Sequence, residues 1–429
     1  MHATAQPLTA AGLSRQQAKT LVLSALGGAL EFYDFVIFVF FATVMGQLFF
    51  PADMPDWLRL AQTFGIFAAG YLARPLGGIL MAHFGDRIGR KRMFMFSILL
   101  MAVPTLLMGL LPTYAAIGVA APLALLLLRI LQGAAIGGEA PGAWVFVTEH
   151  VAARHRNFAC AALSAGLCTG ILLGSLTAQA VNAAFTEAEV RAWAWRLPFL
   201  LGGVFGLIAM VLRRHLHETP VFAELKARQA LAAELPIKAV LRDHGGAVVL
   251  AMLLTWLLSA AVIVTVLMMP TLLQGLGVPR GTALAGNSLA VLTCVLAILL
   301  AGALADRFGA GRLLVLWSLL LGASFWLFYG HALAGEYSHA LYALAGTSAG
   351  VAAMVPAIAV SGFPPAVRFS GLSFAYNTAY AIAGGLTPVL LSLAIRRDPA
   401  APIQYMLAMA GLGVLLGAYV GWRRPRHAD

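Results

Sequence analysis

The chain has 429 residues, of which 61% are hydrophobic and 10% are charged, and its formal net charge is +11. Soluble domains carry about 25% charged residues, so this composition excludes an ordinary water-soluble enzyme or binding domain and indicates a lipid environment. The positive charge does not indicate nucleic-acid binding, because the basic residues occur in short clusters between apolar segments, as in the cytoplasmic loops of membrane proteins.

Twelve apolar segments are long enough to cross a bilayer, which takes about 20 helical residues. The first six are expected at 20–49, 58–83, 93–111, 118–147, 157–182 and 195–213. The last six are expected at 246–273, 283–304, 312–331, 338–362, 369–394 and 402–422. The sequence therefore predicts an all-α membrane protein with twelve transmembrane helices in two pseudo-symmetric six-helix bundles.

The longest polar interval divides the chain into two halves. We expect an N-terminal six-helix bundle at 1–213, a cytoplasmic linker at 214–245 and a C-terminal six-helix bundle at 246–429. One short amphipathic helix is expected in the linker, at 220–234.

Lysine and arginine residues predict the orientation of the chain. If the N-terminus is cytoplasmic, twenty of them fall in cytoplasmic segments and six on the opposite side. The reversed topology would invert this bias, against the preference for positive loops inside. We expect both termini in the cytoplasm and the protein in a bacterial cytoplasmic (inner) membrane.

A short motif occurs once in each half. Residues 85–92 read GDRIGRKR after the second predicted span, and residues 305–312 read ADRFGAGR after the eighth. The Asp-Arg-x-Gly cores occupy equivalent positions, which indicates duplication. Glycine permits a tight turn, and Asp86 can accept hydrogen bonds from amides at the start of the third span.

Either this motif is only a solvated basic loop, or it is a charge latch that holds the halves closed on the cytoplasmic side. Glu149, at the end of the fourth span, would pair with the basic residues of the first copy. The predicted cytoplasmic gate consists of Asp86, Arg87, Arg90, Glu149, Asp306 and Arg307.

The motif resembles the signature loop of the major facilitator superfamily. Further segments are similar to the metabolite:proton symporter family within it: GGALEFYD at 27–34, RPLGG at 74–78, RILQG at 129–133, GGE at 137–139, WRLPF at 195–199 and VRFSG at 367–371. The resemblance covers nearly the whole chain and implies the major facilitator fold. Members of this family carry compounds such as citrate, 2-oxoglutarate, shikimate, and proline or betaine, so the resemblance does not identify one substrate.

Two carboxylates lie inside the first predicted span. Glu31 and Asp34 are three residues apart, which puts them on one helical face. A charge at the bilayer centre costs about 2.5–3.5 kcal/mol on insertion scales, so such residues indicate function. Two close carboxylates cannot easily both stay ionised, so one is expected to carry a proton. The alternative is that both pair with arginines and hold helices together.

Arg74 and Arg129 lie inside predicted spans and are the two arginines that the lysine and arginine count assigns to neither side of the membrane. A guanidinium presents a planar fork of donors that fits a carboxylate, so Arg74 is expected to bind the substrate anion. Gln132 follows Arg129 on the same face. The resemblance implies a proton-transfer role for Arg129, because its Arg-x-x-Gln-Gly pattern is common in proton-coupled members. A structural ion pair is the alternative for each arginine.

Other polar residues inside the spans complete the predicted site. Glu139 either relays protons or pairs with an arginine. Tyr380 is a further candidate for the neutral wall of the substrate site. The predicted proton-coupling residues are Asp34, Glu31, Arg129 and Glu139. The predicted substrate-binding residues are Arg74, Gln132, Tyr33, Trp256, Asn287, Tyr376 and Asn377.

These observations predict a secondary active transporter that takes up a small organic anion with protons by alternating access. The anion would be a mono-, di- or tricarboxylate, and the partners would be this substrate and the lipid bilayer, with no nucleic acid and the protein as a monomer. The alternatives are a proton-coupled exporter of drugs or metabolites and a carrier of a zwitterionic osmolyte.

Chemistry other than transport is not expected. The sequence has no nucleotide loop, His/Cys metal cluster or Ser-His-Asp arrangement, so we expect no enzyme activity, no metal and no cofactor besides protons as the coupling ion. Cys160, Cys168 and Cys294 lie in apolar segments and are expected to be small buried side chains.

Overall fold

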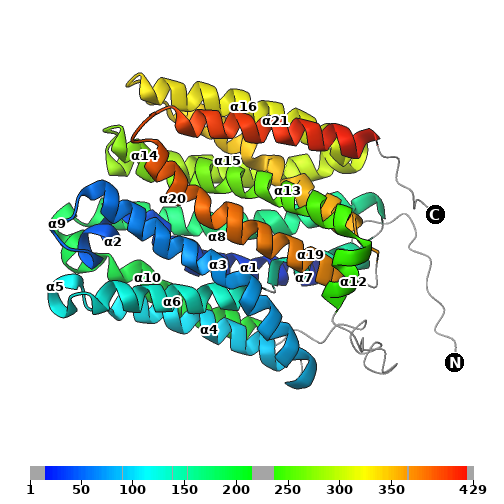
Figure 1. Cartoon of the computed structure of the whole chain (residues 1–429), viewed down its shortest axis with the longest axis horizontal. Coiled ribbons are helices and arrows are strands. Elements are labelled where there is room, and N and C mark those ends of the chain that lie inside the picture. Colours follow the sequence, from blue (N-terminus) through cyan, green and yellow to red (C-terminus); the bar gives the residue numbers. More distant parts are fainter. Residues whose placement is uncertain are drawn as a thin grey trace.

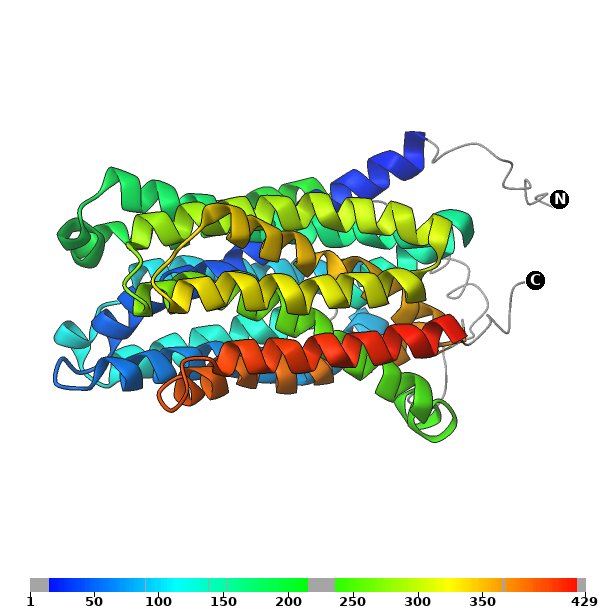
Figure 2. The same ribbon diagram turned by 90° about the horizontal axis from the view of Figure 1, so that it is seen from above.

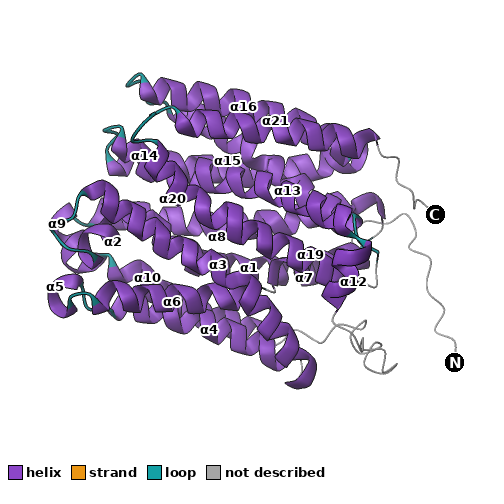
Figure 3. Ribbon diagram, in the orientation of Figure 1, coloured by secondary structure: helices purple, strands orange, loops and turns teal. Residues whose placement is uncertain are grey.

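The computed structural model describes residues 15–88, 90–137, 139–151, 153–214, 236–364 and 367–422, and the regular structure in this part of the chain is helical (Figure 3). Long helices lie side by side in one elongated bundle (Figure 1). The view from above shows that their axes lie roughly along the long axis of the molecule (Figure 2). A helix satisfies its backbone hydrogen bonds internally, as the hydrocarbon core of a membrane requires.

The N-terminal half consists of six spans and their short connections. Its elements are α1 (Arg15–Phe40), α2 (Ala42–Phe49), α3 (Asp56–Ile88), α4 (Arg90–Leu110), α5 (Tyr114–Ile117), α6 (Ala120–Ile136), α7 (Glu139–His150), the 3-10 turn η1 (Ala153–His155), α8 (Arg156–Ala184), α9 (Glu187–Glu189), the π-helix η2 (Val190–Ala194) and α10 (Arg196–Arg214).

The C-terminal half begins after a short helix, α12 (Pro236–Asp243). Its elements are α13 (Gly245–Val262), the π-helix η3 (Ile263–Met268), α14 (Met269–Gly275), α15 (Arg280–Phe308), α16 (Ala310–Leu333), α17 (His339–Ser348), the 3-10 segment η4 (Ala349–Ala353), α18 (Met354–Ser361), α19 (Arg368–Ala379), the π-helix η5 (Tyr380–Gly384), α20 (Gly385–Ala394) and α21 (Ala401–Trp422).

The twelve predicted spans are confirmed. Within the described residues, eight helices are long and apolar enough to cross a membrane, or ten when each of two bent pairs counts as one span. Helices α3 and α4 occupy the remaining two predicted spans. The prediction did not include α12 or the 61° bend between α1 and α2, and the helix expected at 220–234 lies outside the described residues.

Both terminal spans point to one end of the bundle. Helix α1 begins, and α21 ends, at the end of the molecule that we call the terminal end, while α2, α5, α9 and α14 lie at the opposite end (Figure 1). Gly309 adopts a φ of 92° between α15 and α16 at the terminal end. Glycine tolerates this left-handed conformation, so the tight turn expected at the second Asp-Arg-x-Gly motif is present.

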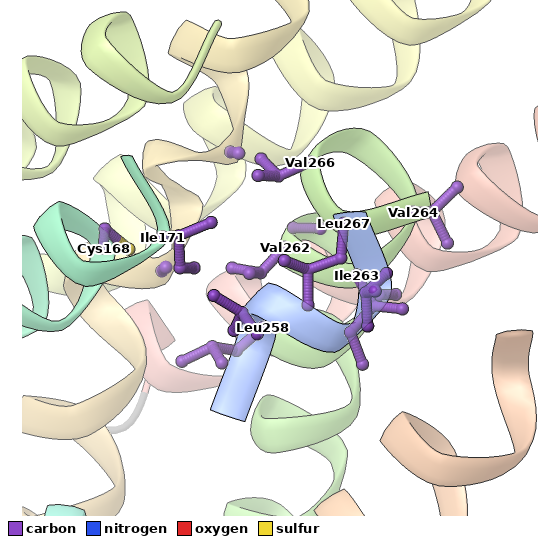
Figure 4. Packing of buried hydrophobic residues seen from close by; sticks show 14 of the residues in the cluster. Cys168, Ile171, Leu258, Val262, Ile263, Val264, Val266 and Leu267 are labelled. Atoms are coloured by element: carbon purple, nitrogen blue, oxygen red, sulfur yellow. The ribbon is translucent and has the colours of Figure 1, made fainter. Parts of the chain in front are cut away.

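The two halves share one apolar core. Cys168 and Ile171 of α8 belong to the same cluster of buried side chains as Leu258 and Val262 of α13, and Figure 4 shows them together with the side chains of η3. The three cysteines predicted to be small buried side chains are buried and free. The centre of the molecule is therefore apolar and tightly packed, which makes each polar side chain in it informative.

Candidate functional site

Helices α3 and α6 cross closely enough to place two arginines at the centre. A methyl group at Gly133 would overlap the carbonyl of Gly70, and one at Gly137 would overlap the carbonyl of Arg74. Glycines therefore allow the two backbones to touch. Arg129 precedes Gly133 by one helical turn, and its guanidinium, like that of Arg74, faces the ring of Phe35 on α1.

Arg129 is fully buried, and its contacts belong to the N-terminal half. Its Nη1 atom donates to the Phe35 carbonyl at 3.0 Å and to Gln132 Oε1 at 2.8 Å. Its guanidinium carbon lies 4.4, 4.8 and 5.2 Å from the ring centroids of Phe35, Phe38 and Phe67. Although Nε and Nη2 have no hydrogen-bond partner, ring faces and two oxygen acceptors compensate the charge and hold the side chain in place.

Arg74 is 1% exposed and contacts both halves. Its guanidinium carbon lies 5.2 Å from the ring centroid of Tyr71 and 5.8 Å from that of Phe35, in the N-terminal half. It also lies 5.7 and 5.0 Å from those of Tyr376 and Tyr380, in the C-terminal half. The Tyr376 hydroxyl is close, but none of the three guanidinium nitrogens has a partner in hydrogen-bond geometry. The N–H groups of Arg74 are thus uncommitted.

The rings around Arg74 also contact one another across the two halves. Tyr71 and Tyr380 stack with their centroids 5.5 Å apart and their planes at 10°. Tyr376 lies 4.8 Å from Tyr380 and 5.0 Å from Trp144 of α7, measured between ring centroids. We call Tyr71, Tyr376 and Tyr380 the tyrosine cage. Because it combines α3 with α19 and η5, any movement between the halves changes it.

Asp34 is 1% exposed and points from α1 toward α4 and α10. A methyl group at Gly202 of α10 would lie 2.5 Å from Asp34 Oδ1 and 2.7 Å from Thr105 Cγ2 of α4, so glycine makes room for the carboxyl group. Asp34 Oδ1 has no hydrogen-bond partner. Glu31, almost one turn earlier on α1, is 4% exposed. The structure thus buries both predicted carboxylates.

Gln132 connects Arg129 to the backbone of Asp34. Its Nε2 atom donates to Thr105 Oγ1 at 2.6 Å and to the Asp34 carbonyl at 3.5 Å, while its Oε1 atom accepts from Arg129. Thr105 Oγ1 donates in turn to the Met101 carbonyl at 2.9 Å. Gln132 therefore ties α6 to α1 and α4 inside the N-terminal half.

Asn377 bridges the two halves one helical turn from Arg74. Its Nδ2 atom donates to the Gly137 carbonyl, between α6 and α7, and to the Ser373 carbonyl at 3.0 Å. The same nitrogen lies 3.9 Å from the place of a methyl group on Gly78, four residues after Arg74 on α3. Two predicted substrate contacts, Tyr376 and Asn377, thus lie beside Arg74.

Tyr33 and Trp256 have other protein partners. The Tyr33 hydroxyl donates to the Pro198 carbonyl of α10 at 2.9 Å. Trp256 is 39% exposed, and its Nε1 atom donates to the Tyr405 hydroxyl of α21 at 2.9 Å. These two contacts join neighbouring helices within one half.

Asn287 of α15 belongs to a buried polar cluster that it forms with residues of α8 and α17. Its Nδ2 atom donates to Ser175 Oγ of α8 at 3.0 Å, and its Oδ1 atom accepts from the Tyr342 hydroxyl of α17. Ser175 Oγ also lies 3.0 Å from Ser288 Oγ. Its side-chain amide is therefore engaged in joining α15 to α8 and α17.

Asp306 closes the terminal end as a cap on a helix of the other half. Its Oδ1 atom accepts from the backbone and side-chain nitrogens of Asn157, both at 2.9 Å, and its Oδ2 atom accepts from the Phe158 amide at 3.0 Å. These amides begin α8, where a carboxylate is favoured by free N–H groups and the helix dipole. Arg307 lies over the ring of Phe308, 5.3 Å from its centroid. The side chains of the other predicted gate residues, and that of Glu139, lie outside the described residues: Asp86, Arg87, Arg90 and Glu149.

The opposite end closes through arginine–aromatic contacts. The guanidinium carbon of Arg280, at the start of α15, lies 5.1 Å from the ring centroid of Phe41. That of Arg396, after α20, lies 3.7 Å from the ring centroid of Trp57, at the start of α3. Each contact joins the two halves. The described residues therefore include contacts between the halves at both ends of the bundle.

The sequence prediction omitted Tyr71 and Trp144. Tyr71 precedes Arg74 by three residues, so their common helical face was a usable signal. Trp144 lies in α7, and no sequence spacing connects it to Tyr376 on α19. Its position follows from the pairing of the halves.

Comparison with known proteins agrees with this architecture. The family model described as Major Facilitator Superfamily matches residues 24–388. The chain is 33% identical to the inner membrane metabolite transport protein YhjE of Escherichia coli (strain K12), with 92% of each chain covered. It is 30% identical to the glycine betaine/proline/ectoine/pipecolic acid transporter OusA of Dickeya dadantii (strain 3937), covering 94% of this chain and 83% of the relative.

Solved structures show the same fold. The crystal structure of a D-xylose-proton symporter superimposes with a TM-score of 0.72 at 17% sequence identity, covering 95% of this chain and 97% of the symporter. The family match, the two relatives and the twelve spans agree. The chain therefore belongs to the major facilitator superfamily and is a multi-pass membrane transport protein and not an enzyme.

Proposed function

We propose that the protein is a proton-coupled symporter that imports a small metabolite by its carboxylate group. The single observation that carries this proposal is Arg74, a buried guanidinium between the two halves whose nitrogens have no hydrogen-bond partner. A carboxylate fits the planar donor fork of a guanidinium better than other common metabolite groups apart from phosphate. OusA is named as a transporter of glycine betaine, proline, ectoine and pipecolic acid, each of which contains a carboxylate group.

Asp34 is the proposed proton carrier. Its carboxyl group is buried, one of its oxygens has no hydrogen-bond partner, and it lies beside α10 and α4. An ionised carboxylate is costly there unless water or a cation reaches it. Protonation would therefore favour the closed arrangement, and opening toward the cytoplasm would release the proton. Glu31, Arg129 and Glu139 are proposed to assist this step.

Helix α1 is the proposed link between the proton and the anion. Asp34 faces α4 and α10, while the ring of the next residue, Phe35, contacts the guanidiniums of both Arg129 and Arg74. The Phe35 carbonyl also accepts from Arg129. A small rotation of α1 on protonation would thus change the surroundings of Arg74. This is a physical contact path between the two sites.

The proposed orientation puts the terminal end in the cytoplasm of the cell that carries the protein in its inner membrane. The distribution of lysine and arginine supports this, and YhjE is named an inner membrane protein. Alternate opening of the two ends would break the Asp306 cap on one side and the arginine–aromatic contacts on the other. A monomer contains both halves and is sufficient for this cycle.

Uptake into proteoliposomes tests the proposal. Purified protein should accumulate a radiolabelled carboxylate from a panel of organic acids and amino acids when the lumen is alkaline, and a protonophore should abolish accumulation. Empty liposomes are the control. Accumulation that is indifferent to the pH gradient, or a panel in which only compounds without a carboxylate are carried, would exclude the proposed function.

A zwitterionic osmolyte is the second candidate substrate class. The observation that favours it is the set of aromatic rings around Arg74, because ring faces also bind ammonium groups. The transporter OusA, 30% identical to this chain, is named for such compounds. Proline and glycine betaine therefore belong in the uptake panel.

A further inference from the structure

Three residues at the tyrosine cage have polar side-chain atoms without a hydrogen-bond partner. The Arg74 nitrogens are donors without an acceptor, Trp144 Nε1 is a donor without an acceptor, and Asn377 Oδ1 is an acceptor without a donor. All three residues are at most 2% exposed. Buried polar atoms in proteins are nearly always paired, so three residues with unpaired atoms in one place indicate a ligand with complementary groups.

The three residues are close enough for one small molecule. The ring of Tyr376 lies 5.7 Å from the Arg74 guanidinium carbon and 5.0 Å from the Trp144 ring. Asn377 is its neighbour in sequence and contacts Gly137, which in turn touches the backbone of Arg74.

The orientation of the Asn377 amide is determined by its surroundings. Nδ2 has two carbonyl acceptors, from Gly137 and Ser373, and an oxygen in its place would face them without a proton to share. The amide must therefore present Oδ1 as the free atom. This atom can be satisfied by a hydroxyl or an N–H group of the ligand.

Trp144 contributes a donor on the other side of Tyr376. The two rings are perpendicular at 86°, so the face of one meets the edge of the other. An aromatic face is a weaker acceptor than an oxygen, and Trp144 Nε1 has no oxygen partner. A second carboxylate oxygen, or a ligand hydroxyl, would satisfy it.

The charge of the site is suited to a single carboxylate. The oxygen-bonded contacts of the other central arginine, Arg129, are with Phe35 and Gln132, and its ring contacts are with α1 and α3. Of the two central arginines, Arg74 is thus the one that contacts both halves. A second or third carboxylate beside Arg74 would have to share this one guanidinium, and its desolvation in an apolar centre is costly.

We infer that this site selects a monocarboxylate that also carries a hydrogen-bond donor, such as a hydroxy acid or an amino acid with a free N–H group. Arg74 binds the carboxylate, Asn377 Oδ1 accepts from the hydroxyl or amine, and Trp144 Nε1 donates to an oxygen of the ligand. The inference rests on the proposed function and narrows it, since it excludes citrate-like acids and fully methylated betaines as preferred substrates.

Matched inhibitors of uptake test the inference on the wild-type protein. One pair is proline and N,N-dimethylproline, and the other is 3-hydroxycyclohexanecarboxylate and 3-methoxycyclohexanecarboxylate, with succinate and citrate for charge. Each is measured as a competitor of the carboxylate that the uptake panel identifies. In at least one pair, the donor-bearing member should bind about 10-fold tighter than its methylated counterpart, because methylation leaves Asn377 Oδ1 unpaired. Succinate and citrate should compete more weakly than that member.

Two variants test which residues cause the preference for the donor-bearing competitor. Asn377→Leu removes the acceptor, so the preference for the donor-bearing member should fall to about onefold. Trp144→Phe retains a ring beside Tyr376 and should weaken binding of both members about 10-fold. Ser373→Ala is the control, because it removes a hydroxyl near Asn377 Nδ2 and should keep the preference. If Asn377→Leu does not fold, the Trp144→Phe variant and the wild-type pairs still decide.

The outcomes separate the two proposals. If no carboxylate accumulates under a pH gradient, the proposed function fails. If carboxylates accumulate but both members of each pair compete equally, or citrate competes best, the proposed function stands and this inference is overturned. An unchanged preference in Asn377→Leu would also overturn it.

Discussion

The two buried arginines of this transporter have similar surroundings but different partners. Arg129 donates to two oxygens, and its ring contacts within the described residues belong to the N-terminal half, whereas Arg74 has no hydrogen-bond partner and contacts rings of both halves. Aromatic faces can keep a guanidinium buried without neutralising it. The comparison teaches that burial alone does not separate a structural arginine from a ligand-binding one, while the state of its N–H groups does.

Replacing Arg74 should have the largest effect on binding. Arg74→Met should weaken substrate binding by about 100-fold or more, because an ion pair with a buried guanidinium is lost. The protein should remain folded and melt at the same or a higher temperature, because an uncompensated charge is removed. Equilibrium binding and thermal melting of the detergent-solubilised protein measure both, with Arg242→Met on α12 as the exposed control. Retained affinity would remove Arg74 from the site.

Replacing Arg129 should have the opposite effect on stability. Arg129→Met leaves the Phe35 carbonyl and Gln132 Oε1 without their donor, which costs about 1–3 kcal/mol for each buried group. We therefore expect a melting temperature below that of both the wild type and Arg74→Met. If the two variants shifted the melting temperature in the same direction by similar amounts, the distinction between the two arginines would be lost.

Replacing Asp34 tests whether coupling to the proton can be lost while the anion is still bound and exchanged. One pH unit across the membrane can drive about tenfold accumulation with one proton. Asp34→Asn should reduce this to about onefold while exchange of labelled for unlabelled substrate continues. Counterflow and gradient-driven uptake in the same proteoliposomes provide the measurement. Gradient-driven accumulation by Asp34→Asn would exclude Asp34 as the coupling residue.

Replacing a residue of the tyrosine cage should have a smaller effect on substrate binding, because the cage acts through Arg74. Tyr380→Phe retains the ring, and Tyr380→Leu removes a face 5.0 Å from the Arg74 guanidinium. Leucine should weaken substrate binding about 2- to 10-fold, and phenylalanine should change it less. Titrations of the two variants with the transported carboxylate compare them directly. Equal losses in both would assign the role to the hydroxyl group instead of the ring.

The fold was predictable because its signals are local. Apolar length located all twelve spans, and Asp86 and Asp306 revealed the repeat. Arg74, Arg129 and Asp34 were likewise predictable, because each is a charged residue in an apolar span. The structure buries all three. The bend at Phe41 and the π-helices η3 and η5 have no comparable signal, because they arise from contacts between helices.

The composition of the site was less predictable, because it depends on which helices meet. Trp256 and Asn287 are polar residues in spans, as Asn377 is, and all three were predicted as substrate contacts. Only the contact of α19 with α7 places Asn377 and Trp144 next to Arg74, whereas Asn287 hydrogen-bonds toward α8. The unpaired atoms of Asn377 and Trp144 beside Arg74, not polarity as such, mark the candidate site.

A cryo-electron microscopy structure with the transported carboxylate bound tests the central claim most directly. The account predicts carboxylate oxygens within hydrogen-bond distance of the Arg74 guanidinium, with the ligand enclosed by Tyr71 and Tyr380, while Arg129 keeps its contacts to Phe35 and Gln132. A ligand bound away from Arg74, or held by Arg129 in its place, would contradict it.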